Sequence, residues 1–351
     1  MMRPRIKEAS LYSKTDTKVR CRTCQRNCEI RQGELGFCKT RQNIDGKLYT
    51  LEYGDISSIS PNPIEKKPFF HFYPGSKALT VGSWSCNFTC PWCQNYDISK
   101  SPQSIGRGKY ISPQTFMQLM KQYDCQGTSI SFNEPTLLLE YSLDVFKLAK
   151  AEGYYNTFVT NGYMTAEAVK LLAEHGLDAM NIDIKGGAET VSRFCHADVG
   201  KVWQNAIEAK RLGIWIEITT LIIPGVNDKD NELRDIANRI ETELGSATPW
   251  HITGYYPADK FRDELFVPPT PLSSLEKVRD MGKDVGLNYV YLGNILGHRY
   301  ENTYCPNCNE LLIERYGFSL TKCRITPDKR CYFCGQKIPI IGALPLSTTQ
   351  D

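Results

Sequence analysis

The stretch SWSCNFTCPWCQN, residues 83–95, places three cysteines in one short loop with the spacing C-x3-C-x2-C. These cysteines are Cys86, Cys90 and Cys93. A structural zinc site takes four ligands, and an iron–sulfur cluster is also usually held by four thiolates. Three clustered thiolates without a fourth nearby therefore indicate a metal centre that keeps one coordination position open.

The overall composition gives no indication of a nucleic-acid or membrane partner. The chain has 351 residues, and its formal net charge of +3 is small for that length. It contains no run of 18 apolar residues that would predict a membrane-spanning helix. The polar N-terminal residues do not resemble a secretion signal. We therefore expect a cytoplasmic protein.

The 14 cysteines fall into three groups, and only Cys125 and Cys195 stand alone. A disulfide framework is typical of small secreted domains, whereas this chain is large and has no predicted secretion signal. Tight C-x2-C pairs in a reducing compartment indicate metal sites instead. The two outer groups are Cys21, Cys24, Cys28 and Cys38 near the N-terminus, and Cys305, Cys308, Cys323, Cys331 and Cys334 near the C-terminus.

The middle of the chain alternates short β-rich runs with amphipathic helical stretches. Several of the helical stretches end in a glycine, which is a typical helix C-cap. This alternation predicts right-handed βαβ units and a parallel sheet, and six units in order favour a partial or full barrel. The predicted strands are 78–82, 128–132, 156–160, 179–185, 214–223 and 250–256, with 287–293 as an edge strand.

The two flanks of the chain lack this alternation. Their cysteine groups predict small metal-stapled extensions on either side of the α/β core. We therefore expect three parts, with bounds 1–75, 76–295 and 296–351. The stretch KKPFFHFYPG, residues 66–75, is too short for a nucleic-acid patch, so we expect its aromatic rings to pack against the barrel while Lys66 and Lys67 face water.

Polar residues recur at the predicted carboxyl ends of the strands, where barrels of this kind carry their chemistry. Each has a local alternative: Glu134 as a helix cap, Thr160-Asn161-Gly162 as a turn, and His251 as a satisfied core histidine. Asp183 and Lys185 can also form an ion pair on one strand face. Their recurrence at one face predicts a ligand site, made of Asn133, Glu134, Thr160, Asn161, Asp183, Lys185, Glu217, Thr219 and His251.

The cysteine loop directly follows the first predicted barrel strand. A 4Fe–4S cluster has four irons, so three cysteine ligands leave one iron free to bind another molecule. A zinc knuckle that lacks one ligand is the alternative interpretation. The loop Cys86, Cys90, Trp92, Cys93 resembles that of the radical S-adenosylmethionine (SAM) superfamily, and the resemblance covers about 76–293. It implies a partial (β/α)6 TIM-like barrel and a 4Fe–4S cluster whose open iron binds the amino and carboxylate groups of SAM.

The resemblance also implies a SAM pocket. Glu134 sits where the superfamily has a Gly-Gly-Glu segment that binds the methionyl amino group, although the glycines are absent here. The segments at Thr160 and Asp183 resemble those that line the pocket in activating enzymes of glycyl-radical enzymes, and His251 falls near a pocket histidine. The implied cofactor-binding residues are Trp92, Asn133, Glu134, Thr160, Asn161, Asp183, Lys185 and His251.

A narrower resemblance covers nearly the whole chain. The strings CRTCQRNCEIRQGELGFCKTRQN, CNFTCPWCQN, TTLIIPGVND and YCPNCNELLIERYGF are similar to those of the AmmeMemoRadiSam-system radical SAM proteins. This resemblance implies Memo-like and AMMECR-like pathway partners. The superfamily resemblance implies a low-potential flavodoxin or ferredoxin as electron donor.

The outer cysteine groups predict further metals. The pairs Cys305-x2-Cys308 and Cys331-x2-Cys334 have ribbon-type spacing, which favours structural zinc over an auxiliary cluster and leaves Cys323 spare. At the N-terminus, zinc and a second iron–sulfur cluster both remain open, because four thiolates suit either.

Three functions are consistent with these patterns. The first is a radical SAM enzyme that acts on a small molecule. The second is an activase that installs a glycyl radical on a protein partner. The third is a metal-ribbon binding protein without catalysis.

Overall fold

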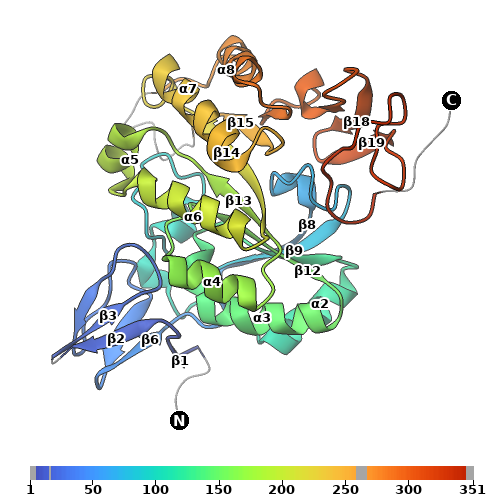
Figure 1. Cartoon of the computed structure of the whole chain (residues 1–351). Helices are drawn as coiled ribbons and strands as arrows, with labels where there is room; N and C mark the ends of the chain where they lie inside the picture. Colours follow the sequence, from blue (N-terminus) through green and yellow to red (C-terminus); the bar gives the residue numbers. More distant parts are fainter. Residues whose placement is uncertain (1–4, 16, 258–266, 345–351) are drawn as a thin grey trace. The chain divides into compact units, whose positions relative to one another are not determined.

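A computed structural model of the chain describes residues 5–15, 17–257 and 267–344 (Figure 1). The chain folds into two compact units. The first comprises Met1–Asn62, Lys77–Met180 and Phe194–Trp215, and the second comprises Pro63–Ser76, Asn181–Arg193 and Ile216–Asp351. The outermost parts of the expected extensions, 1–4 and 345–351, lie outside the described residues. The predicted division into 1–75, 76–295 and 296–351 stays a prediction.

The core of the first unit is a parallel sheet. Strand β11 (Gly127–Ile130) pairs in parallel with β9 (Lys77–Gly82) on one side and β12 (Tyr155–Thr160) on the other. Strand β8 (Ser58–Pro63) is hydrogen-bonded next to β9. Almost every residue of β9, β11 and β12 is buried, as expected for parallel strands covered on both faces.

Helices connect these strands as the sequence predicted, and their ends follow simple capping chemistry. Ser112 accepts a hydrogen bond from the Thr115 N–H, and Thr165 accepts one from the Ala168 N–H. Gly153 and Gly213 have positive φ after their helices, where a side chain would be strained. The helices and turns of this unit are α1 (Tyr96–Ser99), η2 (Pro102–Ser104), α2 (Pro113–Gln122), η3 (Pro135–Leu138), α3 (Leu139–Ala151), α4 (Ala166–Glu174) and α6 (Val199–Arg211).

The N-terminal segment of the first unit forms two small antiparallel sheets, in the orders β1-β6-β5 and β2-β3-β4. Arg41 anchors the segment, because its buried guanidinium pairs with the buried carboxylate of Glu140 on α3 at 2.9 Å. Strand β7 (Asp55–Ile56) pairs separately with β10 (Lys109–Tyr110). The other strands are β1 (Lys7–Glu8), β2 (Tyr12–Thr15), β3 (Lys18–Cys21), β4 (Glu29–Arg31), β5 (Arg41–Ile44) and β6 (Lys47–Thr50).

The second unit also contains parallel strands. Strand β15 (Trp250–Gly254) lies between β14 (Trp215–Ile222) and β16 (Val290–Gly293), and both pairings are parallel. Strand β13 (Ala179–Asp183) lies next to β14 in the sheet order. The helical elements are η1 (Ile64–Lys66), α5 (Ala188–Cys195), α7 (Asp230–Arg239), the π-helical turn η4 (Ile240–Leu244), α8 (Leu272–Val285) and η6 (Arg299–Glu301).

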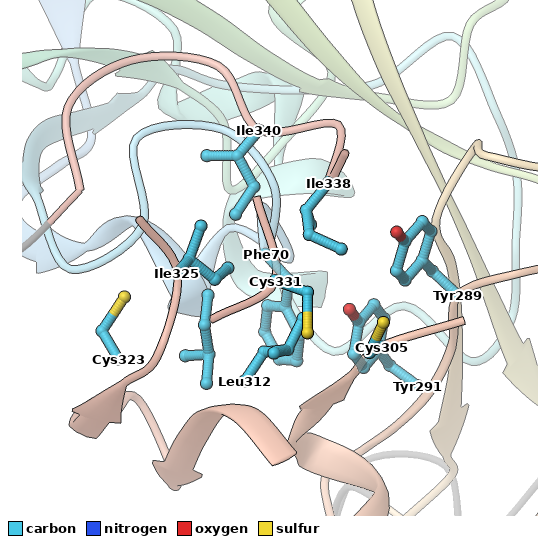
Figure 2. Close-up of a cluster of buried hydrophobic side chains, with 11 residues drawn as sticks. Phe70, Tyr289, Tyr291, Cys305, Leu312, Cys323, Ile325, Cys331, Ile338 and Ile340 are labelled. Atoms are coloured by element: carbon cyan, nitrogen blue, oxygen red, sulfur yellow. The ribbon is translucent and has the colours of Figure 1, made fainter. Parts of the chain in front are cut away.

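The C-terminal part of the second unit is a small sheet of β17 (Thr303–Tyr304), β18 (Leu311–Tyr316) and β19 (Ser319–Cys323), paired antiparallel. Figure 2 shows Cys305 and Cys331 within a cluster of buried apolar side chains. These observations confirm a mixed α/β protein with a central parallel sheet and a C-terminal cysteine cluster. No helix in the described ranges is both long and apolar enough to span a membrane.

The stretch KKPFFHFYPG packs as the sequence predicted, with one exception. Phe70 is buried and its ring lies 4.7 Å from that of His251 on β15 and 4.8 Å from that of Tyr291 on β16. Lys66 is exposed, but Lys67 is only 4% exposed. The expectation that Lys67 faces water is therefore wrong, and burial lowers the pKa of its ammonium group to about 7.

Candidate active site and metal centres

The cysteine loop follows directly after β9 and lies in the first unit. The Cys86 Sγ accepts a hydrogen bond from the Phe88 N–H at 3.3 Å, and the Asn161 Nδ2 lies 3.8 Å from the same sulfur. Burial raises the pKa of the Cys86 thiol to about 12. A positive charge at the sulfur, such as a metal ion, is therefore needed to keep this thiolate ionised near neutral pH.

A segment distant in sequence packs against this loop. The Cys195 Sγ lies 3.2 Å from the Cys90 Sγ, and the Trp92 ring lies 5.4 Å from that of Phe194. The Thr89 hydroxyl is hydrogen-bonded to the Phe194 carbonyl at 3.0 Å. Cys195 stands alone in the sequence. Because it lies more than a hundred residues from Cys90, no local sequence pattern predicts their contact.

Asn133 fixes the start of the cysteine loop. Its Oδ1 accepts a hydrogen bond from the Ser83 N–H at 2.9 Å, and its Nδ2 donates to the carbonyls of Trp84 and Ser85 at 3.1 and 3.0 Å. The residue before it, Phe132, has a φ of 71°, so the chain turns sharply at the end of β11. The structure thus shows that Asn133 contacts the loop. Its predicted role in binding the cofactor stays a prediction.

Glu134 joins the ends of β11 and β12. Its Oε1 accepts hydrogen bonds from the Thr136 N–H at 3.1 Å and from the Thr160 hydroxyl at 2.7 Å, while its Oε2 accepts one from the Asn161 N–H at 2.9 Å. The carboxylate is therefore the cap of η3, as one reading of the sequence predicted. Burial raises the pKa of this carboxyl group. A carboxylate oxygen can accept two hydrogen bonds, so Oε2 retains capacity for a ligand N–H.

Asn161 links this acid to the cysteine loop. Its Nδ2 donates to the Asn87 Oδ1 at 2.8 Å, in addition to its contact with Cys86. The structure thus brings five predicted residues of the first unit together with the loop: Trp92, Asn133, Glu134, Thr160 and Asn161. Asn87 was not predicted, although it lies inside the loop, because nothing in the spacing distinguishes it from its neighbours.

The remaining predicted pocket residues lie in the second unit. The Lys185 Nζ pairs with the Asp183 Oδ2 at 3.1 Å, and both side chains are partly exposed. This is the ion pair that the strand spacing allowed. The Lys185 carbonyl accepts a hydrogen bond from the Asn227 Nδ2 at 3.1 Å, which fixes the backbone after β13. Their predicted roles toward SAM stay predictions.

His251 lies in a buried polar cluster of the second unit. Its Nε2 is 2.6 Å from the Glu217 Oε2, and Glu217 also accepts hydrogen bonds from the N–H groups of Phe70 and His71 at 3.0 and 2.9 Å. Burial opposes ionisation of Glu217, but the hydrogen bond from His251 and the other donors leave its pKa below the ordinary value. His251 therefore has a hydrogen-bond partner within its own unit, and its role as a pocket residue stays a prediction.

The C-terminal cysteines form a compact tetrad. The Cys305 and Cys334 sulfurs lie 3.5 Å apart, and those of Cys308 and Cys331 lie 3.7 Å apart. A tetrahedral zinc ion with Zn–S bonds of about 2.3 Å places its sulfurs about 3.8 Å apart. The four sulfurs thus have the separations that a single metal ion requires, and Cys323 lies outside this group in the apolar cluster.

The loop cysteines have a different arrangement. Three or more His, Cys, Asp or Glu residues can together hold a metal ion. Within the described ranges, the C-terminal tetrad is the one such group whose ligand atoms all lie within 4.8 Å of one another. The sulfurs of Cys86, Cys90 and Cys93 are therefore too widely spaced for one tetrahedral ion, whereas a cluster of several irons binds each thiolate at a different iron. The donor set fits a three-cysteine iron–sulfur cluster.

Comparisons with known proteins identify the family of this chain. The model of the radical SAM superfamily matches residues 84–237. Uncharacterized protein MJ0808 of Methanocaldococcus jannaschii is 43% identical over 338 residues, which cover 96% of this chain and 100% of that protein. The chain belongs to the radical SAM superfamily. Its family membership implies a 4Fe–4S cluster and SAM, and the matched residues include the cysteine loop of this radical SAM protein, whose role as the ligand set stays a prediction.

Two more distant relatives carry different names. The pyruvate formate-lyase-activating enzyme of Clostridium pasteurianum is 22% identical, and the match covers 52% of this chain and 78% of that enzyme. The GTP 3',8-cyclase of Aquifex aeolicus is also 22% identical, with 71% of this chain and 78% of that enzyme covered. Because these two relatives differ in activity, they support general radical SAM chemistry and do not single out one reaction.

A buried acid beside the loop predicts a pH dependence of stability. Glu52 is fully buried, its Oε2 accepts a hydrogen bond from the Trp84 N–H at 3.3 Å, and its Oε1 has no partner among the described residues. Burial raises the pKa of Glu52 to about 8. Because the folded chain then holds a proton that the unfolded chain releases near pH 4.5, stability from this group falls by roughly 1.4 kcal/mol per pH unit between these values.

We expect the Glu52→Gln variant to lack this pH dependence of stability. The free energy of unfolding of the variant, relative to that of the wild type, should therefore increase from pH 6 to pH 8 and then level off. The measurement is the thermal or chemical unfolding midpoint of the anaerobically purified protein at each pH. The surface variant Glu174→Gln is the control and should follow the wild type. Parallel curves for Glu52→Gln and the wild type would contradict the buried, protonated state of this acid.

Proposed function

We propose that this radical SAM protein is an enzyme that cleaves SAM reductively and acts on a small-molecule substrate. The observation that carries the proposal is the three-cysteine loop at the end of β9, held against the Glu134, Thr160 and Asn161 group at the ends of β11 and β12. When bound, the cluster supplies the electron that cleaves SAM and so generates a 5′-deoxyadenosyl radical able to abstract hydrogen from a substrate.

The residues of the first unit have distinct tasks in this proposal. Cys86, Cys90 and Cys93 hold the cluster, and the N–H donors of Phe88 and Asn161 stabilise the Cys86 thiolate. The Glu134 Oε2, which can accept a second hydrogen bond, would accept one from the SAM ammonium group. The buried loop side chains Phe88 and Trp92 would help to exclude water, as a reactive radical requires.

Three residues of the second unit have proposed roles in binding SAM or the substrate. Asp183 would bind ribose hydroxyls, and Lys185 or His251 would contact the methionyl carboxylate or the substrate. Zinc at the C-terminal tetrad would stabilise the small sheet around it. A flavodoxin or ferredoxin would supply electrons, and Memo-like and AMMECR-like proteins would act in the same pathway.

A glycyl-radical activase is the second candidate function. The similarity to the pyruvate formate-lyase-activating enzyme favours it. The two candidates differ in the fate of the radical, because an activase leaves a persistent glycyl radical on a protein partner while the first candidate converts a small molecule.

The first prediction from this proposal concerns SAM cleavage. Reconstituted and reduced under anaerobic conditions, the wild type should produce 5′-deoxyadenosine from SAM, and the Cys86→Ala, Cys90→Ala, Cys93→Ala triple variant should produce none above background. Chromatographic quantification of 5′-deoxyadenosine is the measurement, with Cys125→Ala as the matched control. A wild type that binds neither iron nor SAM would favour the third function, a metal-ribbon protein without catalysis.

The second prediction tests Glu134. Replacing the carboxylate with the amide in Glu134→Gln removes a charge-assisted hydrogen bond worth about 1.5–3 kcal/mol, which corresponds to SAM binding weaker by about 10- to 100-fold. Isothermal titration of the reconstituted protein measures the dissociation constant, while iron content checks that the cluster is intact. Glu174→Gln serves as the control. Unchanged SAM affinity with unchanged iron would remove Glu134 from the pocket.

The third prediction concerns the C-terminal tetrad. The Cys308→Ser, Cys331→Ser double variant should lose about one zinc per chain and unfold at a lower temperature, because a structural metal contributes directly to folding. Elemental analysis and thermal unfolding measure both effects, with Cys323→Ser as the control that keeps zinc. Iron rather than zinc at this site in the wild type would show that the tetrad holds an iron centre.

A further inference from the structure

The four N-terminal cysteines line one buried pocket of the first unit. Cys21, Cys24 and Cys38 are each at most 7% exposed, and Cys28 is partly buried. Apolar side chains, including Ile30 on β4, complete the pocket wall. Four cysteines that surround one apolar pocket indicate a site that binds a metal group.

The sulfurs of this pocket are not arranged for a single ion. They form no group whose atoms all lie within 4.8 Å of one another, although all four residues are described and the C-terminal tetrad does form such a group. The tetrahedral zinc separation of about 3.8 Å is therefore met at the C-terminus and not here. A group with several metal atoms, each bound by one thiolate, fits the wider separation.

Buried hydrogen-bond donors without acceptors point to the same group. The Thr23 hydroxyl and the Arg41 Nε belong to residues that line the pocket, both residues are 1% exposed, and neither atom has a partner among the described residues. Asn87 is fully buried and its Nδ2 also lacks a partner. Cysteine thiolates accept hydrogen bonds at either kind of metal site, and an iron–sulfur cluster adds sulfide ions that accept further hydrogen bonds.

The Asn87 amide lies beside Cys24. Its Nδ2, which has no hydrogen-bond partner among the described residues, is close enough to the Cys24 sulfur to influence it. A buried donor without a partner next to a sulfur ligand is available to hydrogen-bond a metal group that this ligand holds. The pocket therefore contains both the ligands and a second shell of donors for an anionic cluster.

We propose that Cys21, Cys24, Cys28 and Cys38 bind a second iron–sulfur cluster rather than zinc. This inference deepens the proposed function, since the second cluster would serve the same SAM-cleaving site. One electron from a low-potential reductant reduces such a cluster, and passing that electron onward reoxidises it, so the site stores and transfers single electrons.

Direct contacts connect this pocket to the cysteine loop. The Arg26 Nε and Nη2 donate to the Asn87 carbonyl at 2.9 and 2.7 Å, and Nη2 also donates to the Cys195 carbonyl at 3.1 Å. The Asn87 Oδ1 accepts a hydrogen bond from Asn161, whose Nδ2 also approaches the Cys86 Sγ. Asn87 thus lies between a ligand of the second cluster, Cys24, and a ligand of the first, Cys86.

The test is metal and sulfide analysis of the full chain after anaerobic reconstitution with iron and sulfide, with zinc measured in the same samples. The decisive sample is the Cys86→Ala, Cys90→Ala, Cys93→Ala triple variant, in which the N-terminal site is intact. It should keep about two to four iron atoms and as many sulfides per chain. Its dithionite-reduced form should show the electron paramagnetic resonance signal of a reduced cluster.

A second sample is the Cys24→Ser, Cys28→Ser double variant, which should lose this iron and keep the iron of the loop. Cys125 is a buried cysteine in the same unit, so Cys125→Ala is the matched control. This variant should keep the iron of the N-terminal site and the iron of the loop. A triple variant without iron that holds two zinc ions per chain would overturn the inference and leave the proposed function intact. A double variant that loses all iron, beside a triple variant that keeps it, would instead overturn the proposed loop cluster.

Discussion

The buried carboxylate of Glu134 is the interaction on which the candidate site depends. A carboxylate removed from water at the end of a parallel strand is stable only if hydrogen bonds replace the lost hydration. Here the donors come from η3 and from the end of β12, so satisfying one charge fixes the positions of two strand ends. Asn161, held by this arrangement, then directs its amide to the cysteine loop. The loop is thereby positioned by hydrogen bonds and not by the cysteines alone.

The strands, the parallel sheet and the three cysteine groups could be predicted from the sequence because their signals are local. A β-rich run such as 156–160, a glycine after a helix and a C-x2-C pair each lie within a short window. The roles of Asn133, Cys195 and Lys67 could not be predicted in this way. Each depends on partners far away in the chain, and Lys67 in particular has the composition of a surface residue but the burial of a core residue.

The candidate site shows the same division. Sequence spacing supplied the residues near the loop, and the structure then gave several of them structural tasks: Asn133 holds the loop and Glu134 caps η3. His251 is paired with Glu217 in a buried cluster, a contact between adjacent parallel strands that no spacing rule encodes. Residue type and position at a strand end therefore predicted which side chains of the first unit gather beside the loop better than the contacts that each side chain makes.

The three cysteine groups differ in the separation of their sulfurs. The C-terminal sulfurs are as close as one tetrahedral ion requires, while those of the loop and of the N-terminal pocket are more widely spaced. Burial raises the pKa of the Cys86 and Cys24 thiols, so each holds its proton until a cationic centre replaces it. Metal binding in the first unit is therefore coupled to proton release. Arg26 and Asn87 connect the two cysteine groups of that unit through hydrogen bonds.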